Sequence, residues 1–196
     1  MTLLTFSNIL LWVVVLVQLG VIFALARQIG ILFERVSPVG AMISDAGPAL
    51  GDKVAALELP NLNGPGLTLG QAEGRSQLIF FLSTSCPICK ALLPALKSIR
   101  TDEQSWLDVI LASDGREQLH RRLIETEKLG AFPYVLSSEL GMSFKVSKLP
   151  FAVLIDKDGK VVTKGLVNSR EQLESLFTAS ETGIPSYQAA VAGMTS

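Results

Sequence analysis

Both cysteines of this chain lie in one short stretch, Cys86-Pro87-Ile88-Cys89, at a point where the hydrophobic pattern of the sequence changes. Before it, residues 78–82 form a continuous apolar run, which is typical of a strand buried on both faces. After it, residues 90–99 carry leucine and isoleucine at helical spacing. The pattern predicts a buried strand, a short loop and then a helix, with Cys86 at the junction that leads into the helix.

From Gly51 onward the sequence alternates between strand-like and helix-like segments. We expect strands over residues 54–59, 78–82, 107–111, 134–136, 151–155 and 160–164, the last two joined as a hairpin by a turn at residues 156–159. We expect helices over residues 90–99, 116–129, 139–144 and 171–177. This order predicts an α/β domain over residues 51–182, with a mixed sheet covered by helices on both faces.

The two cysteines fit a reactive dithiol better than a staple or a metal site. A disulfide between residues so close in sequence removes little entropy from the unfolded chain. A structural zinc site needs four ligands, and the chain offers two thiols and one histidine, His120. A strand–helix junction, in contrast, supplies free backbone N–H groups and the positive end of the helix dipole, which stabilise a thiolate. We therefore predict Cys86 as the nucleophile and Cys89 as the resolving thiol, with no metal and no cofactor.

The N-terminal segment is predicted to cross a membrane. Residues 3–26 contain no charged side chain and would be about 36 Å long as a helix, enough for a hydrocarbon core of about 30 Å. A cleavable signal peptide is the alternative, because Ala24-Leu25-Ala26 has the form of a cleavage site. A signal peptide begins with a positively charged region, but residues 1–8 hold no Lys or Arg. This favours a helix that is kept as an anchor over a signal peptide that is cleaved. We expect an anchor over residues 1–35, a linker over 36–50 and a loosely ordered tail over 183–196.

The predicted location is the bacterial inner membrane, crossed once, with the catalytic domain in the periplasm, where protein disulfides form. The charges nearest the helix, Arg27, Glu34 and Arg35, follow it, and the positive-inside rule places that end in the cytoplasm. Two arginines offset by one glutamate are only a weak signal for orientation. We therefore base the predicted orientation on the dithiol, which suits a compartment where protein disulfides form. A formal net charge of −1 argues against a nucleic-acid partner.

Two prolines extend the pattern around the dithiol. Pro94 stands five residues after Cys89, and Pro150 stands immediately before the apolar run at residues 151–155. These positions resemble the thioredoxin superfamily, in the form found in its membrane-anchored TlpA-like and ResA-like branch. The resemblance implies a kink at Pro94 and a cis-proline at Pro150 that faces the dithiol. It also implies that the backbone of Leu149 is exposed for pairing with an extended substrate.

Two positions depart from thioredoxin. Ser85 stands where thioredoxin has a tryptophan before its first cysteine, and Phe80 replaces a buried acid that is assigned proton transfer at the second cysteine. These departures favour a dedicated periplasmic role over a general reductase, with Pro87 and Ile88 between the cysteines tuning the thiolate.

A narrower resemblance rests on several stretches along nearly the whole chain, to about Gly183. The stretches are Arg27–Arg35, Pro38–Ile43, Gly47-Pro48, Cys86–Cys89, Glu139–Met142 and Lys164–Arg170. Together they resemble the MauD family of methylamine-utilisation proteins. The resemblance implies an accessory role in maturing methylamine dehydrogenase, with its disulfide-rich small subunit as the protein substrate, by disulfide formation or isomerisation. It implies also an unidentified redox partner, while the direction of electron flow stays open.

Other functions remain as alternatives. A thioredoxin-like protein could deliver copper through the cysteine pair and His120, although we interpret His120 as a solvated residue on a helix face. A periplasmic thiol reductase acting on another client is a second alternative. A peroxidase is a third, since Ser83 precedes Cys86 by three residues as in peroxiredoxins, but Ile79 stands where they have a proline.

Overall fold

A computed structural model describes residues 2–35, 47–70 and 74–182, and the side-chain surroundings of residues 5–23, 47–70 and 74–177. The chain divides into two units, Met1–Pro38 and Val39–Ser196. Most of the predicted linker, residues 36–46, lies outside the described residues, and so does the predicted tail over residues 183–196.

The N-terminal unit contains one long helix, α1, over Thr2–Arg35. The predicted helix is confirmed and extends beyond residue 26. Its segment Thr5–Phe23 has a mean hydropathy of 2.3, and none of that segment is buried by the rest of the described chain. A core helix of a water-soluble domain would bury its apolar side chains, whereas this one exposes them along the whole segment. By length and composition, the segment suits a membrane span.

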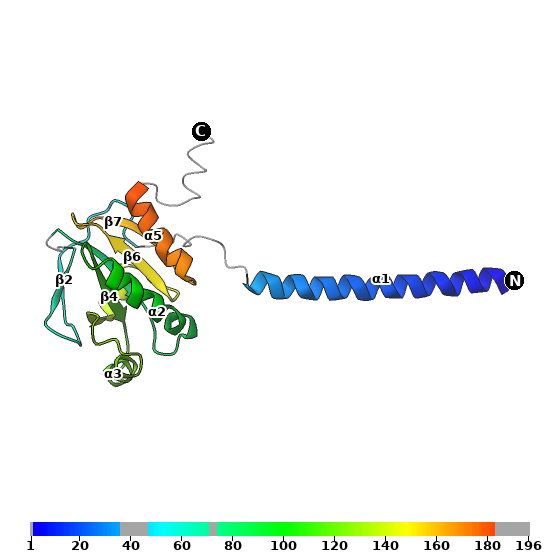
Figure 1. Cartoon of the computed structure of the whole chain (residues 1–196), viewed down its shortest axis with the longest axis horizontal. Coiled ribbons are helices and arrows are strands. Elements are labelled where there is room, and N and C mark those ends of the chain that lie inside the picture. Colours follow the sequence, from blue (N-terminus) through cyan, green and yellow to red (C-terminus); the bar gives the residue numbers. More distant parts are fainter. Residues whose placement is uncertain (1, 36–46, 71–73, 183–196) are drawn as a thin grey trace. The chain divides into compact units, whose positions relative to one another are not determined.

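The second unit is built on a five-stranded mixed sheet in the order β5-β4-β3-β6-β7 (Figure 1). The strands are β3 Ser76–Phe81, β4 Leu107–Ser113, β5 Tyr134–Leu136, β6 Phe151–Ile155 and β7 Val161–Leu166. The three strands β3, β4 and β5 run parallel, while β6 and β7 pair antiparallel as the predicted hairpin. A separate small hairpin pairs β1 Leu57–Leu59 with β2 Leu67–Leu69.

Helices cover both faces of this sheet, as predicted. They are α2 Pro87–Asp102, α3 Glu117–Thr126, α4 Ser138–Ser143 and α5 Arg170–Thr182. Side chains of α2, α3 and α5 join Phe80 and its face of the sheet in one buried cluster. Leu140 of α4 joins Ile79, Phe81 and the β1–β2 hairpin in a second cluster. Neighbouring residues of β3 therefore point to opposite cores, which explains why its sequence is apolar without alternation.

Two predicted elements are shorter in the structure than expected. The strand expected over residues 54–59 is limited to β1, because Val54 N–H bonds instead to the Gly159 carbonyl, at 2.8 Å, beside the β6–β7 turn. The helix expected to run to residue 129 ends at Thr126, and Lys128 adopts a φ of 54°, a left-handed conformation that no helix can continue through.

The chain enters the domain through Gly47-Pro48, which packs against residues far away in sequence. Gly47 has a φ of 82°, and a Cβ there would overlap the carbonyl oxygen of Phe144, just after α4. Lys164 of β7 is 2% exposed and donates from Nζ to the carbonyl oxygen of Pro48, at 2.7 Å. Two of the stretches that carry the family resemblance thus meet beside α4.

Candidate functional site

Cys86 occupies the N-cap of α2, the position predicted from the sequence. Its backbone is extended, and its Sγ accepts a hydrogen bond from the backbone N–H of Cys89, at 3.1 Å. Pro87 takes the first helical position, where the N–H that proline lacks would have no partner in the helix. A thiolate at Cys86 would therefore receive a backbone hydrogen bond and the positive end of the helix dipole.

The two sulfurs differ in accessibility. Cys86 and Cys89 form a disulfide, with Cα atoms 5.3 Å apart. Cys86 is half-buried, whereas Cys89 is 1% exposed and packs into the core between the sheet and α2. Ile88, between them, is 45% exposed. Cys86 is therefore the more accessible residue of the pair; its role as the nucleophile stays a prediction.

The second predicted part of the site lies at the same end of the sheet. The Leu149–Pro150 peptide bond is cis, as predicted. Phe151 of β6 pairs with Phe81 of β3, so the segment that leads into the cysteines and the segment that ends at Pro150 meet at one edge. Leu149 is 37% exposed, and its backbone N–H and C=O make no hydrogen bond within the described part of the chain.

Pro94 and Phe80 are two further positions that the sequence singled out around the cysteine pair. Pro94 lies inside α2, where its missing N–H leaves one helical hydrogen bond unmade; the kink stays a prediction. Phe80 is fully buried in the core beneath α2. No aspartate or glutamate is buried among the residues whose side chains the structure describes. That part of the chain thus places no buried carboxylate beside Cys89.

Ser83 shapes the turn that precedes Cys86. Its carbonyl oxygen accepts the backbone N–H of Cys86 at 3.2 Å, and its hydroxyl oxygen accepts that of Ser85 at 3.4 Å. The Ser83 and Ser85 hydroxyl oxygens are 3.2 Å apart. Ile79, where peroxiredoxins have a proline, is fully buried in the core on the α4 side. Ser83 and Ser85 therefore act here as residues of a structured turn.

The interpretation of His120 as a solvated residue is wrong. His120 is 2% exposed, and both of its ring nitrogens have partners. Nε2 lies 2.8 Å from the carbonyl oxygen of Asp114, which can only accept, so Nε2 carries the proton and donates. Nδ1 then accepts from the hydroxyl of Tyr134, at 2.7 Å. Burial raises the pKa of that hydroxyl above its usual range, which keeps it a donor.

The arrangement leaves His120 without a lone pair for a metal ion. Within the described residues there is no group of three or more His, Cys, Asp or Glu side chains that could hold one. The sequence did carry a signal for this burial, because His120 and the core residue Leu123 are three residues apart and share a helix face.

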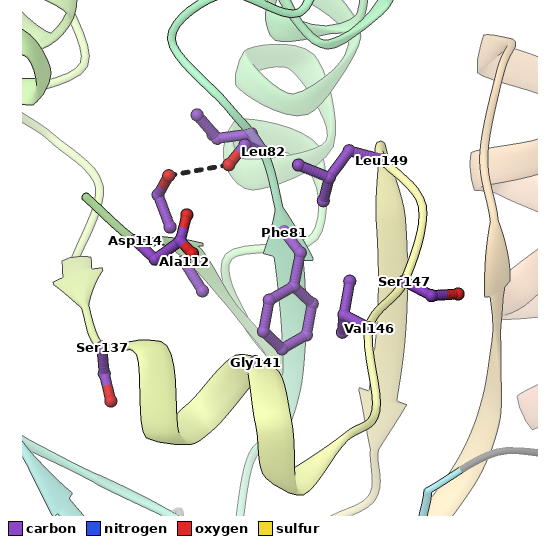
Figure 2. Close-up of a pocket in the computed structure, with 10 residues that line it drawn as sticks. Phe81, Leu82, Ala112, Asp114, Ser137, Gly141, Val146, Ser147 and Leu149 are labelled. Carbon is purple, nitrogen blue, oxygen red and sulfur yellow. Dashed lines mark hydrogen bonds between the residues drawn. The ribbon is translucent and has the colours of Figure 1, made fainter.

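Sequence reasoning also missed a serine and a pocket. Ser113, at the end of β4, donates its hydroxyl to the carbonyl oxygen of Leu82 at 2.7 Å, and so fixes the segment that leads to Cys86 (Figure 2). Beside this bond is a pocket of about 140 Å³. The pocket is lined by Phe81, Leu82, Ala112, Ser113, Asp114, Ser137, Gly141, Val146, Ser147 and Leu149.

Comparison with known proteins places this site in a family. The sequence profile of the AhpC/TSA family matches residues 50–184. The methylamine utilization protein MauD of Paracoccus denitrificans is 46% identical over 184 residues, which cover 93% of this chain and 91% of the relative. MauD of Paracoccus versutus is 44% identical over 188 residues, covering 96% and 94%. The chain belongs to the AhpC/TSA family and to the MauD family. The similarity to these MauD proteins extends over more than nine-tenths of the chain.

Solved structures agree with the fold. The thioredoxin domain of a thiol-disulfide oxidoreductase from Bacteroides vulgatus matches with a TM-score of 0.57 at 21% identity, covering 66% of this chain and 96% of that one. StoA from Bacillus subtilis matches with a TM-score of 0.53 at 22% identity, covering 61% and 94%. These likenesses establish the thioredoxin-like fold for this member of the MauD family.

Proposed function

We propose that this MauD-family chain is a membrane-tethered thiol–disulfide oxidoreductase of methylamine utilisation, with Cys86 and Cys89 as its redox pair. The observation that carries the proposal is the position of Cys86. Cys86 is half-buried, and its sulfur caps a helix N-terminus and accepts a hydrogen bond from the backbone N–H of Cys89, while Cys89 itself is buried. A sulfur in that position is stabilised as a thiolate and is the one that a client thiol can reach.

The exchange proceeds through a mixed disulfide. With the pair oxidised, a client thiolate attacks Sγ of Cys86, the Cys86–Cys89 bond breaks, and Cys89 leaves as a thiolate that takes up a proton. A second client thiolate then attacks the client sulfur of the mixed disulfide and releases Cys86. Two electrons pass from the client to the chain; Cys86 is released as the thiolate that the helix N-terminus stabilises, and the proton on Cys89 comes from the solvent. Reduction of a client runs through the same steps in reverse, and isomerisation returns the electrons to the same client.

The proposed client is the small subunit of methylamine dehydrogenase. Support comes from the curated relatives, which are named methylamine utilization proteins, and from the match over nearly the whole chain. A redox partner that resets the Cys86–Cys89 pair belongs to the same proposal.

Trapping the mixed disulfide tests this function. In cells that express the dehydrogenase genes, full-length Cys89→Ala should accumulate a disulfide-linked complex with the small subunit, because the resolving thiol is gone. Cys86→Ala is the matched control and should accumulate little of it. Equal or greater trapping by Cys86→Ala would overturn the assigned roles, and trapping of other proteins alone would overturn the client.

The proposed location is the periplasmic face of the inner membrane, with α1 as the anchor. The exposed apolar segment Thr5–Phe23 supports the anchor, and the need for a compartment that permits disulfides supports the periplasm. A reporter that is active only outside the cytoplasm, fused after Ser196, should give signal in the membrane fraction. Signal from a fusion partner active only in the cytoplasm would contradict the proposed orientation.

The copper-delivery alternative is disfavoured by His120, whose ring nitrogens are both engaged in buried hydrogen bonds. Titrating the reduced chain with Cu(I) separates the two functions. We expect no change in binding when His120 is replaced by Leu, whereas tight binding that depends on His120 would favour copper delivery.

A further inference from the structure

The pocket found beside Leu82 lies at the sheet edge that also carries the redox pair. Its walls come from the carboxyl ends of β3 and β4, from α4 and from residues 146–149 (Figure 2). Figure 2 shows Ala112 and Asp114 on one side of the Phe81 ring, with Val146 and Leu149 on the other. Leu82 is four residues before Cys86, and Leu149 immediately precedes Pro150. The pocket is thus bounded by the two segments that frame the site.

The size and lining of the pocket fit one apolar side chain. A cavity of about 150 Å³ lined by apolar side chains holds a benzene molecule, and this pocket measures about 140 Å³. Phe81, Leu82, Ala112, Val146 and Leu149 supply apolar lining. Asp114 is exposed at the same pocket, and its backbone is fixed by the hydrogen bond from His120. A carboxylate there disfavours an acidic side chain by charge repulsion.

The backbone next to the pocket is open to an extended peptide. The backbone N–H and C=O groups of Ser147, Lys148 and Leu149 make no hydrogen bond within the described part of the chain. A peptide that pairs with such a segment gains its affinity from main-chain hydrogen bonds, and its specificity from pockets that take alternate side chains. An extended client paired at Leu149 would therefore present some of its side chains to the pocket.

We propose that this pocket binds a phenyl-sized apolar side chain of the client, a few residues from the cysteine that reacts with Cys86, and rejects an acidic one. The proposal rests on the redox function proposed above and adds a specificity site to it. The proposed site also gives a role to Glu139–Met142, one of the stretches that resemble the MauD family. These residues form most of α4, which contributes Gly141 to the lining of the pocket.

Gly141 makes the pocket testable without disturbing the fold. It lines the pocket from α4, and a Cβ built on it meets no atom within 4 Å. Because Gly141 lines the pocket and the space around a Cβ there is open, we expect a leucine at this position to fill part of the pocket. Gly130 offers a matched control, because a Cβ on it also meets no atom within 4 Å and it does not line the pocket.

The experiment uses the full-length chain in detergent, with Cys89→Ala so that Cys86 stays a free thiol. The probes are short peptides with one cysteine activated as a 2-thiopyridyl disulfide. The Cys86 thiolate attacks the peptide sulfur, a Cys86–peptide disulfide forms, and pyridine-2-thiolate leaves. It takes a proton to give 2-thiopyridone, which is followed by its absorbance. Phe, Gly and Asp are placed in turn at each of the positions flanking the cysteine.

We expect Phe at one position to react about tenfold faster than Gly at that position, and Asp to react more slowly than Gly. Gly141→Leu should lower the Phe-to-Gly ratio to about one, while Gly130→Leu should leave it at about ten. A ratio near one at every position, or a high ratio that survives Gly141→Leu, overturns the pocket. If Cys86 reacts with every peptide no faster than free cysteine does, the proposed redox function itself fails.

Discussion

Replacing His120 should lower the free energy of unfolding, because this side chain ties α3 to the end of β4 and to β5. Its two buried hydrogen bonds, to Asp114 O at 2.8 Å and to Tyr134 Oη at 2.7 Å, contribute about 1 kcal/mol each. His120→Leu also leaves the buried Tyr134 hydroxyl without its acceptor, so we expect a loss of about 2–4 kcal/mol. Tyr134→Phe removes one bond and should cost about 1–2 kcal/mol.

A double-mutant cycle separates this hydrogen bond from simple packing. The double variant should cost about 1 kcal/mol less than the sum of the two single variants, because the shared bond is counted in both. Urea unfolding of the full-length chain in detergent, followed by Trp fluorescence, measures each value. Gln118→Leu, on the exposed side of α3, is the control and should change stability by less than about 0.5 kcal/mol. Additive costs, or a His120→Leu cost no larger than the control, would refute the buried hydrogen-bonded histidine.

Three further predictions concern other parts of the domain. Burial raises the pKa of Tyr134, so above about pH 10 this group ionises in the unfolded chain but not in the folded one. The free energy of unfolding should therefore fall as the pH rises above that value. Tyr134→Phe should make this fall smaller when urea unfolding is measured at several pH values. Lys164→Met should lower the free energy of unfolding by about 1–3 kcal/mol and speed proteolysis near Pro48, with the exposed Lys160→Met as control; equal behaviour of the two would contradict the anchoring of Pro48. Ser113→Ala should cost about 1–3 kcal/mol by leaving the buried Leu82 carbonyl unpaired, and no loss in urea unfolding would show that this bond is dispensable.

The strands best predicted from the sequence are those buried on both faces. The apolar runs at residues 78–82 and 151–155 correspond to β3 and β6, and residues 107–111, which are apolar except for Asp108, correspond to the first part of β4. Such runs are easy to recognise because each residue must be apolar to pack against one core or the other. The strand β2, Leu67–Leu69, was missed, since three residues between turns carry too little pattern.

The cysteine pair could be placed from the sequence because it lies between a buried strand and a helix, and Pro150 because its position before a buried strand resembles that of the thioredoxin superfamily's cis-proline. The burial of His120 could be inferred from its spacing to Leu123, but its hydrogen-bond partners could not, although a histidine is tolerated in a core only when both nitrogens find partners. Those partners, Asp114 and Tyr134, are supplied by other elements that only the fold brings together. The pocket beside Leu149 was invisible for the same reason, since its lining comes from four separate segments of the chain.

The reduction potential of the Cys86–Cys89 pair is the measurement that tests the central claim most directly. The full-length chain would be equilibrated in glutathione buffers of known potential, and its free thiols counted by alkylation. A half-buried sulfur at a helix N-terminus should give a redox-active pair, with a potential between about −270 mV and −120 mV. A potential below about −300 mV would identify a structural disulfide and contradict the account.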